Sequence, residues 1–377
     1  MLSYYIKYKI NGVNMNSIYD ELKNSLGEYS DILKVIDNKR KSTKYVKELL
    51  AKLDLPEADL TLEALNEKAS YRMNHILFTF SLGILLAKFL ELDQLITKEY
   101  SKYFKDEKNV FYKVWLMLSL YHDFGYFIQN KYKDCSKFDL IEVENNIFSF
   151  NSEKIQAMKL FGLPENEVMT RYDKKIYEKY YECYYKKNNE IEPVEHGIIG
   201  GYILFDEIIK NNQNVETKKR VNVKRGLEIN ENKVNDELIY QDICYRIMEH
   251  NIWAIDKTKD YFASFIIPEL KPIFIENFNI IDSKEPLLML LSLTDTIEYI
   301  KKLSTTGLDN PNAQNRPTTL AKKILINISK NMIIIDVNGV VKIDGYNKWK
   351  DSIENINSWV DVYSIYENGQ LVINSKV

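Results

Sequence analysis

The residues best suited to chemistry are four histidines and two aspartates set in apolar surroundings. Each histidine lies in or beside a hydrophobic segment: His75 in YRMNHILFTF, His122 in LSLYHDFGY, His196 in VEHGIIGGY and His250 in RIMEHNIW. Asp123 follows the second histidine, and Asp295 ends the run LLMLLSLTD. Burying imidazoles and carboxylates costs free energy unless a partner compensates. One shared metal centre would compensate all of them, because a cation offsets the desolvation of carboxylates and binds neutral imidazoles.

Helices are expected to position these residues, since the apolar patterns around them have helical spacing. The expected helices cover residues 61–92, 108–123, 194–210, 237–255 and 284–303. The second half of the first helix is apolar nearly all round, which is typical of a helix in the middle of a bundle. Residues 14–55 are expected to form shorter amphipathic helices. The main body is therefore predicted to be all-α.

The sequence changes character after about residue 304. Residues 305–318 resemble a linker, and a short helix is expected at 319–330. Two Asn-Gly pairs, Asn338–Gly339 and Asn368–Gly369, predict β-hairpins, with a helix between them. The predicted organisation has three parts: an N-terminal helical extension at 1–58, an all-α domain at 59–304 with polar insertions near 129–190 and 211–236, and a small α+β C-terminal unit at 319–377.

Composition bounds the setting of the protein. The net charge is -3, so no general attraction to nucleic acid is indicated. Three separated cysteines give no disulfide framework, which favours a cytoplasmic protein. The apolar stretch 76–90 is shorter than a membrane span requires and is expected to be a buried core helix. The expected partner is a small phosphate or nucleotide substrate, without a membrane; the oligomeric state stays open.

The order His, His-Asp, His, His, Asp over residues 60–305 resembles the HD superfamily of metal-dependent phosphohydrolases, in its two-metal form. The dyad before a glycine, the final Asp within LxDxxE and Arg72 three residues before His75 add to this resemblance. It implies an HD-domain helical bundle and an enzyme. The implied reaction is hydrolysis of a phosphoester or phosphoanhydride, most readily in a nucleotide or cyclic nucleotide, by a hydroxide that two metal ions activate.

The resemblance also implies a role for each residue. Asp123 would bridge the two metals, and Asp123 and Arg72 are the expected catalytic residues. The first metal would add His75, His122 and Asp295, and the second would add His196 and His250. Imidazole and carboxylate together favour Fe or Mn, with Mg, Ni, Co or Zn as alternatives.

One position departs from the family pattern. Many members have HDxGK, whereas this chain has HDFGY, so Tyr126 replaces a phosphate-binding lysine. Arg72 is the first candidate to hold a phosphate instead, because its planar guanidinium matches phosphate oxygens. Asn251 is a weaker candidate for a substrate contact.

Other interpretations stay open. A di-iron oxygenase related to inositol oxygenase would have the same ligand order on the same fold, and a nucleotide-sensing regulatory protein would keep the site without turnover. Core histidines assembled by chance, or a metal-free scaffold, are the functionless alternatives. Glu298, one turn after Asp295, is expected to form a salt bridge rather than to orient a ligand. The tyrosine-rich stretch 177–185 and the basic run 218–225 are expected to be a packed helix and a solvated loop.

Overall fold

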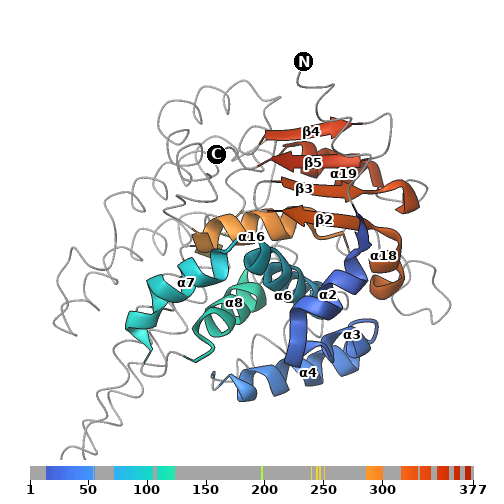
Figure 1. Cartoon of the computed structure of the whole chain (residues 1–377). Helices are drawn as coiled ribbons and strands as arrows, with labels where there is room; N and C mark the ends of the chain where they lie inside the picture. The colour runs from blue at the N-terminus through green and yellow to red at the C-terminus, as the bar shows by residue number, and fades with distance from the viewer. Residues whose placement is uncertain are drawn as a thin grey trace, which may run out of the picture. The chain divides into compact units, whose positions relative to one another are not determined.

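The computed structural model describes part of the chain, and this part is mostly helical with a smaller share of strand (Figure 1). The described residues are 14–53, 55, 72–104, 108–123, 286–299, 316–329, 332–340, 346–355, 361–365 and 370–374, with the single residues 197, 239, 243, 244, 246, 247 and 250. By its internal contacts the chain divides into two units: Met1–Glu57, Ala69–Leu95 and Lys271–Val377 form the first, and Ala58–Lys68 and Ile96–Leu270 form the second. The expected fold, helical with a strand-containing part, is confirmed at this level.

Short amphipathic helices begin the described chain, as expected. They are α2 (Ile18–Leu26), the 3-10 helix η1 (Gly27–Tyr29), α3 (Ile32–Val35) and α4 (Lys39–Lys52). Side-chain caps start two of them: the Ser17 hydroxyl accepts from the backbone N–H of Asp20, and the Asn38 amide oxygen accepts from that of Lys41. The apolar faces of α2 and α4 pack on α6.

Two buried helices form the centre of the first unit. They are α6 (Arg72–Phe89) and α16 (Pro286–Ile297), which pack against each other. Every residue from 73 to 87 and from 286 to 297 is buried. The core helix expected at 76–90 is thus confirmed, and a polar residue within 73–87 or 286–297 lies inside the protein whichever way it points.

The second unit contains α8 (Val110–Tyr121), an apolar helix that is buried at all but two positions. The helix α7 (Leu92–Tyr100) and the 3-10 helix η2 (Ser101–Tyr103) precede it in the sequence. Five described residues within 237–255 are helical and buried: Ile239, Ile243, Cys244, Arg246 and Ile247. The polar insertions near 129–190 and 211–236 lie outside the described residues.

A five-stranded antiparallel sheet completes the first unit (Figure 1). Its order is β1 (Asn16–Ser17), β2 (Leu325–Ser329), β3 (Met332–Asp336), β5 (Gln370–Asn374) and β4 (Asp361–Ile365). Two helices accompany it, α18 (Pro317–Lys323) and α19 (Tyr346–Asn355). The pairing of β4 with β5 confirms the hairpin expected around Asn368–Gly369. The two-residue strand β1 connects the N-terminal segment to this sheet by pairing with β2.

Two expectations for the C-terminal region were wrong. The helix expected at 319–330 ends at Lys323, and β2 follows, since the β-branched stretch LINIS pairs with β3. The hairpin expected at Asn338–Gly339 does not form: Asn338–Val340 is a 3-10 helix, η6, and β2 and β5 already occupy both edges of β3. Gly339 serves a close approach, because a Cβ there would lie 2.3 Å from the carbonyl oxygen of Lys323.

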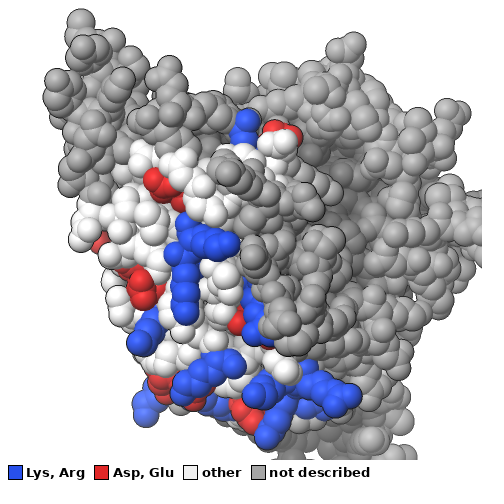
Figure 2. Space-filling model, turned by 90° about the vertical axis from the view of Figure 1, so that its right-hand side faces the viewer, with Lys and Arg blue, Asp and Glu red and all other residues white. Residues whose placement is uncertain are grey.

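Both signs of charge occur on the face drawn in Figure 2, and no single described helix is long and apolar enough to cross a membrane. Figure 2 shows lysine and arginine side chains lying among carboxylates on one face. Exposed ion pairs join Lys34 to Asp31 at 2.6 Å and Lys52 to Glu28 at 2.9 Å, and such pairs contribute little to stability. Among the described residues, only the bent helix pair Met73–Phe89 and Leu92–Tyr103 passes a test of length and apolar composition, and no single helix does.

Candidate metal centre

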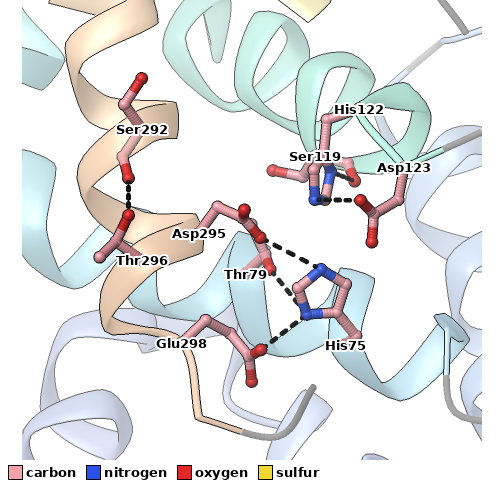
Figure 3. Close-up of polar contacts among 9 residues, drawn as sticks. All are labelled: His75, Thr79, Ser119, His122, Asp123, Ser292, Asp295, Thr296 and Glu298. Carbon is pink, nitrogen blue, oxygen red and sulfur yellow. Dashed lines mark hydrogen bonds and ion pairs between the residues drawn. The ribbon is translucent and has the colours of Figure 1, made fainter. Parts of the chain in front are cut away.

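The first unit holds the His75 ring between two carboxylates (Figure 3). His75 lies near the start of α6 and is fully buried. Its Nδ1 lies 2.8 Å from Oε2 of Glu298, and its Nε2 lies 3.5 Å from Oδ1 of Asp295. A carboxylate oxygen accepts hydrogen bonds, so the Nδ1–H donates to Glu298. The lone pair of the neutral ring is therefore on Nε2, the nitrogen that faces Asp295.

The second unit presents two more histidines in the same tautomer. His122 directly follows the last residue of α8, and its Nδ1 lies 2.8 Å from the carbonyl oxygen of Ser119. The Nδ1 of His250 lies 2.6 Å from the carbonyl oxygen of Ile247. A carbonyl only accepts, so Nδ1–H donates in both cases and Nε2 carries the lone pair. The two rings are 5.6 Å apart between centroids and nearly perpendicular.

Each unit pairs one Nε2 with an aspartate oxygen at a distance that suits two ligands of one ion. The His122 Nε2 lies 3.6 Å from Oδ1 of Asp123, which resembles the 3.5 Å between His75 and Asp295. Both distances are longer than the N···O distance of an N–H···O hydrogen bond, which is about 2.7–3.2 Å. Two ligands bound at about 2.0–2.2 Å to one cation are separated by roughly 3.0–3.4 Å. The spacing in both pairs therefore lies closer to that of metal ligands than to that of hydrogen-bond partners.

Three residues also form a group that could hold a metal ion. They are His75 and Asp295 of the first unit and His122 of the second, and all three residues are buried. Two imidazole nitrogens and a carboxylate oxygen are the donor set of many transition-metal sites. The donor chemistry of this group therefore fits a divalent cation.

The local electrostatics also favour a cation. Asp295 and Glu298, which flank His75 in the first unit, are at most 7% exposed, and burying two carboxylates together is costly without positive charge. Asp295 and His122 lie at the C-terminal ends of their helices, where the helix dipole is negative. Burial, with the nearby charges of Glu298 and Asp37, raises the pKa of Tyr299 well above its ordinary value, so this neighbour stays neutral.

Not every predicted site residue falls among the described ones. His75 lies beside Asp295 in the first unit, and Asp123 and His250 lie beside His122 in the second. Arg72 is the first residue of α6, and its side chain is outside the described part. His196, Tyr126 and Asn251 also lie outside the described residues. The ligand roles of these residues, and the placing of Arg72 against a phosphate, remain predictions.

Two residues were missed or undervalued in the sequence. Glu298 was expected to form a salt bridge, and its partner is the candidate ligand His75 itself. Arg246 was not singled out in the sequence, and the structure shows that it is a buried charged residue, 4% exposed. The signal was its spacing: it lies four residues before His250 in RIMEH, which is one helical turn.

Comparison with known proteins adds no assignment: no family model matches the chain, and no curated protein or solved structure does. The resemblance to the HD superfamily thus depends on the six site residues and their order.

Proposed function

We propose that this protein is a metal-dependent hydrolase that cleaves a phosphoester or phosphoanhydride, with a nucleotide or cyclic nucleotide as the expected substrate. One observation carries the proposal: each of the three described histidines donates its Nδ1–H to an acceptor, which places the lone pair of the neutral ring on Nε2. Metal-binding histidines in proteins characteristically have this arrangement. A histidine that only fills the core also needs an acceptor for its N–H, and it is the aspartate oxygens beside Nε2 of His75 and His122 that favour metal ligation.

The chain's own groups would divide the work as follows. The Nε2 atoms of His75, His122 and His250 and the carboxylates of Asp123 and Asp295 would hold two divalent ions, Fe or Mn by preference, with His196 as the sixth ligand. When bound, such ions lower the pKa of a water and neutralise phosphate oxygens. The acceptors behind each ring keep it in one orientation. The buried surroundings exclude bulk water, which strengthens every charge interaction at the site.

Hydrolases and di-iron oxygenases of this fold have the same ligand order, so the ligands alone do not separate the two reactions. We propose hydrolysis because it is the reaction that the resemblance to the HD phosphohydrolases implies. Elemental analysis of protein purified without chelator tests the metal. Anaerobic assays of nucleotides and cyclic dinucleotides with Mn²⁺ and Fe²⁺ test the reaction. We expect close to two ions per chain. We also expect release of phosphate or of a nucleoside monophosphate in the absence of dioxygen.

Asp295→Ala should abolish this turnover, and Glu48→Ala on the exposed side of α4 serves as the control. Oxygen consumption without phosphate release would overturn the hydrolase in favour of an oxygenase. Nucleotide binding without turnover would favour a sensor. If elemental analysis finds no metal in the purified protein, the hydrolase, the oxygenase and the metal-containing sensor all lose their basis.

A further inference from the structure

We propose that Glu298 is a positioning residue that sets the tautomer and orientation of His75 and thereby strengthens metal binding at Nε2. Its effect on the metal depends on the proposed function. Its effect on the ring does not, because that effect follows from the contact between Nδ1 of His75 and Oε2 of Glu298 alone. The Nδ1 to Oε2 distance is 2.8 Å and both residues are 0% exposed, so solvent does not compete for either group.

Glu298 differs in kind from the groups behind the other described histidines. His122 and His250 donate to backbone carbonyls three residues earlier in the sequence, whereas Glu298 is 223 residues from His75 and offers a side chain. A carboxylate withdraws the Nδ1 proton more strongly than a carbonyl does and makes Nε2 a better electron donor. Among the described histidines, His75 is therefore expected to be the most basic ligand.

The backbone that carries Glu298 is fixed on both sides. Its own N–H donates to the Thr294 carbonyl at 2.9 Å, the last helical bond of α16. The preceding carbonyl, of Ile297, accepts from the Trp349 indole N–H at 3.1 Å. The following side chain, Tyr299, donates its hydroxyl to the Pro317 carbonyl at 3.0 Å. Two elements that accompany the sheet, α18 and α19, thus hold Glu298 in place against α6.

The test compares three variants in the full-length protein. Glu298→Ala removes the acceptor, and Glu298→Gln keeps an acceptor oxygen without the charge. Thr296→Val is the control: it is buried on the same helix and bonds only its own Ser292 carbonyl among the described residues, at 2.7 Å. The first measurement is the ¹⁵N chemical shift of the histidine nitrogens in metal-free protein, which is practical because the chain has four histidines. The second is the Mn²⁺ dissociation constant from calorimetric titration.

We expect wild type, Glu298→Gln and Thr296→Val to hold His75 with the proton on Nδ1, and Glu298→Ala to populate the other tautomer. Mn²⁺ affinity should fall about 10–100-fold in Glu298→Ala and by less in Glu298→Gln. Thr296→Val should stay within about twofold of wild type.

Each contrary outcome has one meaning. An unchanged tautomer and affinity in Glu298→Ala overturn the inference, and so does an equal loss of affinity in Thr296→Val. If Glu298→Ala does not fold, Glu298→Gln decides: Mn²⁺ affinity equal to wild type would then overturn the inference. If wild type binds no Mn²⁺, the proposed function fails, and the tautomer measurement still tests the role of Glu298.

Discussion

In the first unit the side chain of Glu298, directly after α16, holds the His75 ring, whereas in the second unit backbone carbonyls hold the rings of His122 and His250. The carbonyls lie three residues before each histidine, so those rings are oriented as soon as the local turn forms. The His75 ring is oriented only after α16 has packed on α6. Ligands held locally and ligands held by tertiary contacts are therefore expected to respond differently to substitution.

The largest expected effect comes from removing a ligand in either unit. His75→Ala and His122→Ala should each weaken Mn²⁺ binding by more than about 100-fold, since loss of an outer hydrogen-bond partner alone costs about 10–100-fold. If both residues hold the same ion, each single variant should weaken the same binding step, and the double variant should weaken it at least as much as either single one. Calorimetric titration of the three variants checks this.

Two binding steps, of which each single variant weakens only one and leaves the other at wild-type affinity, would contradict a shared ion. Circular dichroism of the metal-free variants provides the control for folding.

Metal binding should also stabilise the protein. Free Mn²⁺ at about 100 times its dissociation constant should raise the free energy of unfolding by about 2.7 kcal/mol, because the ion binds the folded state. Urea unfolding with Mn²⁺ or with EDTA measures the difference, and Asp295→Ala should abolish it. An equal gain in Asp295→Ala would mean that the ion binds elsewhere.

The comparison also explains what could be predicted from the sequence. The apolar segments, and the single polar residues within them, are visible in the sequence. The buried helices α6, α8 and α16 and the candidate ligands His75, His122 and Asp295 could therefore be predicted. A carbonyl three residues before a buried histidine follows from helix geometry alone. The bond between His75 and Glu298 depends on how α6 and α16 pack, and no local pattern encodes that. The same limit applies to Gly339, where tertiary proximity to Lys323, not turn chemistry, requires a glycine.

A smaller effect is expected within the first unit, where Tyr299 after α16 contacts the start of α18. Tyr299→Phe removes the hydroxyl that donates to the Pro317 carbonyl, which should cost about 1 kcal/mol of stability near neutral pH. Burial raises the pKa of this phenol well above 10.0, so the folded state keeps the proton at a pH where the unfolded chain loses it. Wild-type stability therefore declines as pH rises above about 10, through this group.

The variant lacks that contribution, so the difference between wild type and Tyr299→Phe should narrow above pH 10. Urea unfolding at pH 8 and at pH 10.5 tests the sign. A difference that widens at the higher pH would contradict a raised pKa.

The smallest effect is expected at Ser119, and it isolates the contrast between the two kinds of support. The hydroxyl of Ser119 donates to the Trp115 carbonyl at 2.7 Å, while His122 uses the main-chain carbonyl of Ser119. Ser119→Ala keeps that carbonyl, so Mn²⁺ affinity should stay within about twofold of wild type, against the 10–100-fold loss expected for Glu298→Ala. The lost hydroxyl bond and the higher helix propensity of alanine should nearly cancel in stability. A tenfold loss of affinity in Ser119→Ala would show that the side chain orients His122, and the distinction between backbone and side-chain support would then fail.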